Sequence, residues 1–248
     1  MPSYITKILL FVWILIQLVS CNSIKYVQEN ENLLKDNKLV INGEKNKDSK
    51  IESYLSQKPN RKTIGIPLPL YFYNFGNEDF EMTFEEWMEV HPKKYNRYES
   101  LFSKKQTFII YKNKRTVNNW FLNKGEAPVI YDPLKTSRSA NTLKDYFISK
   151  GFFEAEVNFD TLKVGEKELE VTYNIETNTQ YLIDSVSTEI ESSVIDSIYM
   201  ANNQNSFLKK GKPFVFEDFE KEEARLVNLF RNSGIYHLHQ PYFSGFFG

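Results

Sequence analysis

Cys21 is the residue of this 248-residue chain whose chemistry is easiest to anticipate. It is the only cysteine, so it has no partner for a disulfide and no second thiolate for a metal site. One positive charge, Lys7, and the uncharged run 8–20 precede it. As a helix that run would reach roughly 20 Å, less than the ~30 Å hydrocarbon core of a membrane. We therefore expect a cleaved export signal rather than a permanent membrane span.

The four residues Leu18-Val19-Ser20-Cys21 resemble a bacterial lipoprotein box. The resemblance implies a diacylglycerol on the Cys21 sulfur, a signal peptide at residues 1–20 and a chain that begins at Cys21. Asn22 resembles the outer-membrane address of some bacterial lipoproteins. The alternative is an uncleaved anchor with an incidental cysteine. Either alternative places most of the protein outside the cytoplasm.

Other residues with catalytic or metal-binding side chains form no ordered set. His237 and His239 would share a face of a strand and could hold a metal, but no third ligand stands at a comparable spacing. Ser192-Ser193 lacks a histidine or acid in an ordered motif, and Glu85-Glu86 is typical of a solvated helix face. No glycine-rich phosphate loop occurs. We expect no enzymatic activity, catalytic residue, cofactor or metal.

The overall charge balance offers no basis for nucleic-acid binding. Lysine and arginine number 31 against 32 acidic residues, a net charge of −1. The same balance gives no argument for polybasic membrane binding. The 20 phenylalanines and 15 tyrosines instead favour strands with large buried side chains.

An internal repeat organises the second half of the chain. Residues 143–153 and 226–236 share a layout of amphipathic helix, glycine and strand, with an offset of 83 residues. Upstream, 124–129 and 210–214 match with a similar offset of 86 residues between their glycines. The glycines of this repeat motif are Gly125, Gly151, Gly211 and Gly234.

The first copy has the pattern of a helix that packs on a sheet. Thr136 or Ser137 could cap the helix, and Gly151 suits a left-handed turn at its end. Its apolar face and the alternating apolar residues of the two following strands, which flank a turn at 163–167, give the expected core. These residues are Ala140, Leu143, Phe147, then Phe153, Ala155, Val157, Phe159, and finally Leu169, Val171, Tyr173, Ile175.

The segment after the leader is a weaker copy. Leu39–Ile41 followed by Asn42-Gly43 indicates a strand and a turn, and Ser49-x-x-Glu52 indicates a capping box that opens a helix. The apolar stretch 64–75 contains two prolines and is too short to span a membrane, so we expect it to be buried against the sheet.

These patterns predict an α+β fold of tandem small β-α-α-β-β repeats, with helices on one face of short mixed sheets. We expect the first repeat at residues 21–76. The second covers 77–179, with a connecting element at 77–105. The third covers 180–248 and is truncated, because no final strands follow.

The whole arrangement resembles the periplasmic polypeptide-transport-associated (POTRA) repeats of BamA/TamA-type outer-membrane proteins. The motifs that carry the resemblance run from Tyr146 to Val157, from Tyr181 to Ile183, from Lys210 to Phe214 and from Arg225 to Tyr236. Those that resemble a lipoprotein-signal-bearing branch are Asn42-Gly43, Lys58 to Lys62 and Tyr73 to Gly76.

The resemblance implies a non-enzymatic, protein-binding scaffold on the periplasmic face of the outer membrane, held by a lipid anchor on Cys21. It would bind client or partner polypeptides by β-augmentation. Family members continue into a C-terminal β-barrel, and no barrel strands follow here, so we expect a fragment of an outer-membrane assembly or translocation factor. The alternative is a stand-alone outer-membrane lipoprotein that serves an assembly machine.

Overall fold

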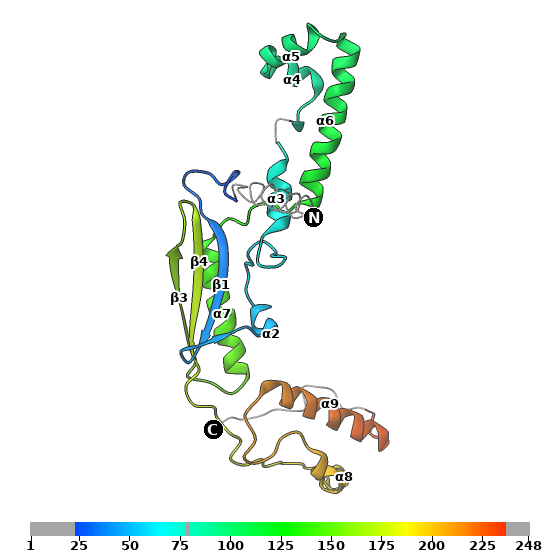
Figure 1. The fold of residues 1–248 in the computed structure, drawn as a ribbon. Helices are drawn as coiled ribbons and strands as arrows, with labels where there is room; N and C mark the ends of the chain where they lie inside the picture. The colour runs from blue at the N-terminus through cyan, green and yellow to red at the C-terminus, as the bar shows by residue number, and fades with distance from the viewer. Residues whose placement is uncertain (1–22, 78–79, 237–248) are drawn as a thin grey trace, which may run out of the picture. The chain divides into compact units, whose positions relative to one another are not determined.

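The computed structural model describes residues 23–77 and 80–236, which form a small sheet and a series of helices (Figure 1). The elements are β1 (Leu33–Ile41), β2 (Glu44–Asn46), α2 (Ser49–Glu52), α3 (Leu68–Phe75), α4 (Phe84–Val90), α5 (Pro92–Glu99), α6 (Lys104–Lys124), α7 (Pro133–Ser149), β3 (Glu156–Lys163), β4 (Glu168–Glu176), α8 (Ser193–Asn202), η2 (Asn203–Asn205) and α9 (Phe216–Asn232).

The sheet has four strands in the order β2-β1-β4-β3. β1 and β2 are antiparallel and joined at Asn42-Gly43, where both φ angles are positive (50° and 82°), as a tight hairpin turn requires. β1 and β4 run parallel, since the Leu33 amide donates to the Lys167 carbonyl and the Asn42 amide to the Ile175 carbonyl. A mixed sheet with helices confirms the predicted α+β class.

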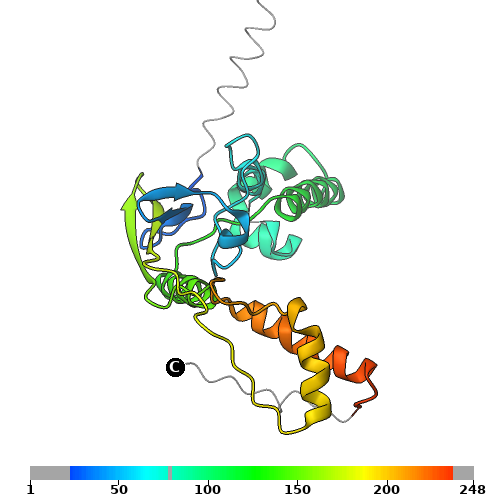
Figure 2. The same ribbon diagram turned by 90° about the horizontal axis from the view of Figure 1, so that it is seen from below.

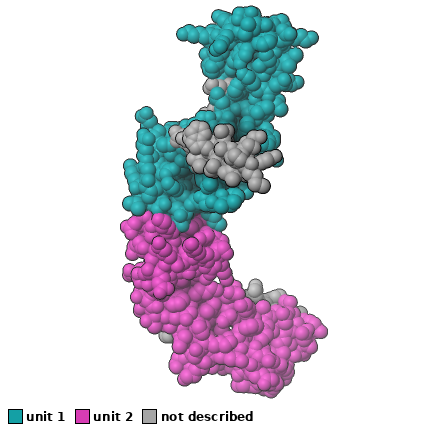
Figure 3. Space-filling view, in the orientation of Figure 1, with its two compact units in different colours: residues 1–37, 58–132, 161–171 teal, residues 38–57, 133–160, 172–248 magenta. Residues whose placement is uncertain are grey.

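The contacts within the chain divide it into two compact units, coloured separately in Figure 3. Of the described residues, unit 1 holds 23–37, 58–77, 80–132 and 161–171, and unit 2 holds 38–57, 133–160 and 172–236. The division passes through β1, β3 and β4 rather than between two separate sheets.

Helix α7 lies along the strand segments of its own unit (Figures 1 and 2). The residues predicted to form its apolar face are buried, and so is every second residue of β4, which confirms both periodic patterns. These buried residues are Ala140, Leu143, Phe147, Leu169, Val171, Tyr173 and Ile175.

Two predicted helix starts are wrong. α7 begins at Pro133, so Thr136 and Ser137 lie inside the helix, and Thr136 is buried. Proline suits a first helical position because its missing N–H would have no helical partner there. α2 is capped by Asp48, whose side chain accepts from the Lys50 amide, so Ser49 is the first helical residue rather than the cap.

The strands of the first two predicted repeats belong to one sheet. β1 and β2 come from the segment 21–76 and β3 and β4 from 77–179, yet β1 pairs directly with β4. Each hairpin alone would leave its apolar face in water. Joined in one four-stranded sheet, the two hairpins can bury their apolar residues in a common core. The segment boundaries themselves stay a prediction.

Helices α3 to α6 form a helical region within unit 1. The expectation that 64–75 is buried against the sheet is confirmed for Leu70, which lies in a buried cluster with Leu33 of β1. It is wrong for the rest of the stretch, because α3 packs on α6 and Ile64 is 96% exposed. The connecting element 77–105 contains α4 and α5, and with α6 it surrounds a buried aromatic cluster of Phe84, Trp87 and Tyr111. Among the residues described, no helix has the length and hydropathy needed to cross a membrane.

The last helices of the two repeat copies end in the same way. In α7 the Gly151 amide donates to Ile148 and the Phe152 amide to Phe147; in α9 Gly234 donates to Arg231 and Ile235 to Phe230. Each donor and acceptor differs from its counterpart by 83 residues, the offset read from the sequence. Both glycines have φ of +87°, the left-handed conformation of this helix ending.

Candidate functional site

The candidate site is the outer edge of β3. β3 is the last strand of the sheet order, so within the described residues only one side of its main chain pairs with another strand. Most of its residues are exposed. Phe159 is 36% exposed, and the predicted apolar face of this strand is therefore only partly buried. An eight-residue edge with free peptide groups is a template for an added strand.

Contacts with β4 hold this edge in place. The ring of Phe159 lies 6.3 Å from the ring of buried Tyr173, and the Asn174 side chain donates to Asp160 at 2.8 Å on the other face. The Val164 amide donates to the Glu168 carbonyl and closes the hairpin. β3 is thus supported from one side and presented to solvent on the other.

At the opposite edge of the sheet, both ends of β1 are paired with other segments. β2 has three residues and pairs with the end of β1, while the Leu34 amide donates to the Val129 carbonyl near its start. Buried Asn60 holds this covering segment: its side-chain amide donates to the Ala127 carbonyl, and its oxygen accepts from the Val129 amide. β3 is consequently the long open edge among the described strands.

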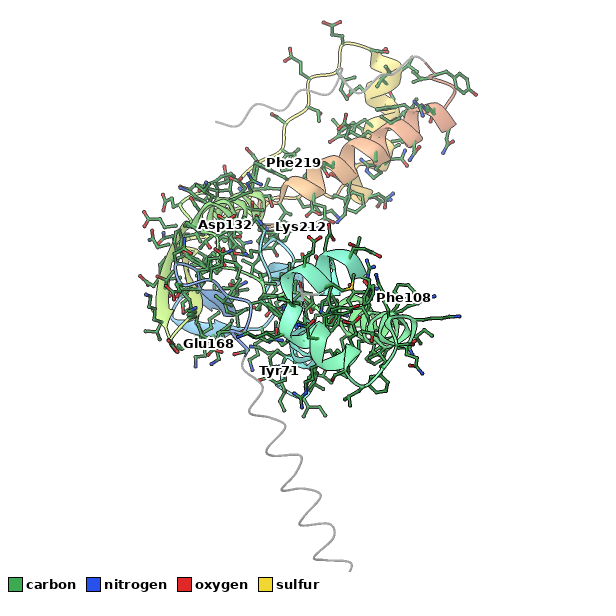
Figure 4. All side chains as sticks on the ribbon, turned by 90° about the horizontal axis from the view of Figure 1, so that it is seen from above. Tyr71, Phe108, Asp132, Glu168, Lys212 and Phe219 are labelled. Atoms are coloured by element: carbon green, nitrogen blue, oxygen red, sulfur yellow. The ribbon has the colours of Figure 1, made fainter. Side chains whose placement is uncertain are left out.

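Glu168 fixes the start of β4 to the chain's first described residues. It accepts from the Ser23 hydroxyl at 2.7 Å and from the Lys35 ammonium at 2.6 Å (Figure 4 labels Glu168). Partial burial acts to raise the pKa of this carboxyl, and the hydrogen bonds from Lys35 and Ser23 outweigh it and lower the pKa. The segment after Cys21 is therefore attached to unit 1.

Glu222 of α9 is a buried charge that the sequence reasoning missed. It is 5% exposed and accepts from Arg225 through two nitrogens, at 2.6 and 2.9 Å, and from the Phe207 amide. Arg225 in turn donates to the Asn202 carbonyl at the end of α8. The sequence contained one sign of this pair, the Glu-x-x-Arg spacing on a helix. That spacing is equally typical of ion pairs exposed to solvent, so it did not indicate burial.

The four motif glycines occupy different environments. Gly151, Gly211 and Gly234 have positive φ angles, whereas Gly125 is extended and ends α6. A Cβ on Gly125 would lie 2.3 Å from the Tyr73 nitrogen, so this glycine permits close approach of α6 to α3. The roles assigned to these glycines stay predictions, and the equivalence of Gly125 and Gly211 is not evident from their conformations.

The remaining candidates for chemistry form no catalytic or metal site that the structure describes. Cys21, His237 and His239 lie outside the described residues. Ser192 caps α8 by accepting from the Ile195 amide, and Glu85-Glu86 forms part of the exposed first turn of α4. Within 23–77 and 80–236, histidine, cysteine and acidic side chains form no cluster that could hold a metal.

Comparison with protein-family models gives a match. The family model described as "POTRA: Surface antigen variable number repeat" matches residues 36–178, more than half of the chain. The match begins inside β1 and includes the other three strands and α7. No curated protein and no solved structure matches significantly.

Proposed function

Because the chain belongs to the POTRA family, we propose that it is a protein-binding scaffold of a bacterial outer-membrane assembly or translocation system, acting on the periplasmic side. POTRA domains are non-catalytic domains that bind other polypeptides in outer-membrane assembly proteins. The finer assignment to a BamA/TamA-type factor, and to its lipoprotein branch, is part of the proposal.

The observation that supports this proposal best is the open edge of β3. Main-chain N–H and C=O groups on that edge can pair with an extended client strand, and neighbouring side chains such as Leu162 add apolar contact. Such pairing depends little on the client's sequence, which suits a protein that handles many clients. The binding mode is β-augmentation.

We expect a peptide of about ten residues with alternating apolar and polar side chains, the pattern of a barrel strand, to add to β3. At saturating peptide, the outward amides of residues 156–163 should exchange about tenfold more slowly, because each gains a hydrogen-bond partner. Hydrogen exchange followed by NMR measures this residue by residue. Unchanged exchange along β3 contradicts the proposal.

Neighbouring proline substitutions supply the control. Alternate amides of an antiparallel strand face opposite edges, so Asn158→Pro and Phe159→Pro remove one inward and one outward N–H. Loss of an inward N–H breaks a hydrogen bond to β4 and lowers the exchange protection of β4. The variant that keeps this protection has therefore lost an outward N–H, and it should bind the peptide at least about tenfold more weakly. Equal peptide binding by that variant argues against main-chain pairing at this edge.

Attachment to the membrane through Cys21 is a second part of the proposal, supported by the lipoprotein box. In cells given an alkyne-tagged fatty acid, the chain should incorporate the label and Cys21→Ser should not, because the sulfur is the acceptor. Unlabelled wild-type chain would contradict lipid anchoring. Thr6→Ser, outside the lipoprotein box, serves as a control that keeps the cysteine and should still incorporate the label.

The alternative form of the scaffold is a stand-alone lipoprotein accessory. An antibody against residues 181–248, used on native membranes, distinguishes the two forms. A band near 29 kDa that is indifferent to boiling favours the accessory. A much larger band that shifts on boiling favours an assembly factor with a barrel.

A further inference from the structure

The α3–α6 pair exposes an unusual share of aromatic surface. Phe72 and Phe75 of α3 and Val117 and Trp120 of α6 are all exposed, and Trp120 is 50% exposed. The side chains form one continuous patch, since the Phe72 ring lies 6.2 Å from that of Trp120 and both α3 rings contact Phe121. We call these four exposed residues, with Phe121 between them, the α3–α6 face.

The face includes an apolar hollow. Phe75, Val117 and Phe121 contribute to the lining of a recess of about 360 Å³, together with polar residues such as Asn113. Apolar surface of this kind beside polar groups is characteristic of a binding surface rather than of an ordinary solvated helix.

Helix α6 carries a strong local positive charge. It contains six basic residues and no acidic residue, although the whole chain has a net charge of −1. Lys105, Lys112 and Lys124 are exposed on the same helix as Val117 and Trp120. A helix that combines exposed tryptophan and apolar residues with lysine is typical of one that lies on an anionic membrane.

The chain just after Cys21 is fastened to this helix pair. The Lys25 ammonium donates to the Asn74 and Gly76 carbonyls at 2.7 and 2.8 Å, at the C-terminal end of α3, and the Tyr26 hydroxyl also donates to Gly76. Carbonyls at a helix end lack helical partners and attract a cation. Tyr26 and Tyr73 also make a ring contact at 5.6 Å.

This attachment limits the distance between a lipid on Cys21 and the α3–α6 face. Lys25 is the fourth residue after Cys21, so their Cα atoms lie at most about 14 Å apart. If Cys21 is lipidated, as the proposed function holds, the Lys25 backbone lies within that distance of the Cys21 backbone, and the end of α3 lies one lysine side chain farther. The membrane is then the nearest large apolar and anionic surface available to this face.

We propose that the α3–α6 face is a docking surface for an anionic phospholipid membrane, placed beside the lipid anchor. Trp120, Phe72, Phe75 and Val117 insert at the interface, while the α6 lysines pair with lipid phosphates. The inference rests on the proposed anchoring for its location, but the surface itself binds lipid without the anchor.

The test uses the chain from Cys21 onward with Cys21→Ser, which cannot carry a thioether-linked lipid and retains every described residue. We expect it to co-sediment with vesicles of phosphatidylcholine and about one third phosphatidylglycerol at least tenfold more strongly than with phosphatidylcholine alone. Bromine-labelled lipids should quench the fluorescence of Trp120. Equal or absent binding to the two vesicles overturns the proposal.

Two double variants separate the apolar and charged parts of the face. Val117→Gln with Trp120→Gln, and Lys105→Gln with Lys112→Gln, should each weaken anionic-vesicle binding about tenfold. Leu134→Gln, an 80% exposed apolar residue on α7, is the matched control and should leave binding unchanged. Circular dichroism checks that each variant folds.

Further outcomes are decisive in either direction. If the Val117→Gln, Trp120→Gln variant binds vesicles as strongly as the unsubstituted chain does, the proposal is overturned. It is also overturned if the unsubstituted chain binds no vesicles but self-associates in sedimentation, and the variant does not self-associate, because the face then contacts a second copy of the chain. If vesicle binding follows the expected order while fatty-acid labelling of Cys21 fails, the docking surface stands and the anchoring proposal fails.

Discussion

Replacing Glu222 by alanine is expected to destabilise the α8–α9 part of unit 2 by about 3 kcal/mol. The substitution leaves the Arg225 guanidinium poorly exposed and without its bidentate partner, and it leaves the Phe207 amide without the carboxylate that accepts from it. Removing one member of a buried pair costs more than the pair contributes, because the remaining charge stays desolvated. Hydrogen exchange of α9 amides in the full chain should accelerate roughly a hundredfold.

Glu217 is the matched control on the same helix. Hydrogen bonds from Lys221 and Lys150 lower the pKa of Glu217 to about 2, but the side chains of Glu217 and Lys221 are about half exposed to solvent and that of Lys150 is 25% exposed. Water and salt screen such a pair, so Glu217→Ala should leave α9 exchange nearly unchanged. An effect of Glu217→Ala as large as that of Glu222→Ala would contradict the role given to burial.

The Glu222–Arg225 pair also makes the stability of the α8–α9 part depend on pH in the acid range. Burial acts to raise the pKa of Glu222, but the hydrogen bonds from Arg225, Phe207 and Ser206 outweigh it and lower the pKa below 4.5. A carboxyl whose folded pKa is lowered stabilises fully above its unfolded pKa and loses that contribution as pH falls through the folded value. Protection of α9 should therefore fall below about pH 4.5, and Glu222→Gln should reduce that dependence.

Patterns that depend on near neighbours were predictable from the sequence. The alternation of Leu169 to Ile175 identified a strand that is buried on one face, and the three- and four-residue spacing around Leu143 identified the packed side of α7. The 83-residue offset identified two helix endings with the same hydrogen bonds. Each alternation or helix pattern, and each single copy of the helix ending, lies within about a dozen residues, where backbone geometry sets the period.

Features that depend on distant partners were not predictable in the same way. The parallel pairing of β1 with β4 joins residues more than 130 positions apart, and nothing local specifies it. Ser49 and Thr136 were suitable caps by type, yet Asp48 caps α2 and α7 begins at Pro133. The charge of α6 was hidden because acidic residues elsewhere cancel it in the total.

Gly151→Ala is expected to destabilise unit 2 by about 3 kcal/mol, through two separate costs. The φ angle of +87° is unfavourable for any residue with a Cβ, a cost of about 1 kcal/mol. The new Cβ would also lie 2.5 Å from the Phe214 carbonyl oxygen and 3.3 Å from that of Tyr181, both main-chain atoms, so the backbone must shift. The Tyr181 amide, which donates to the Gly151 carbonyl, should exchange roughly a hundredfold faster.

Gly234→Ala isolates the first of these costs. Gly234 ends α9 with the same φ of +87°, and no atom of the residues that the structure describes lies within 4 Å of where its Cβ would be. The substitution should cost only about 1 kcal/mol, seen as roughly fivefold faster exchange of the Ile235 amide. The difference between the two variants measures the close approach of 181 and 214 to the end of α7. Equal effects would mean that these segments move away freely, and that Gly151 is required for its backbone conformation alone.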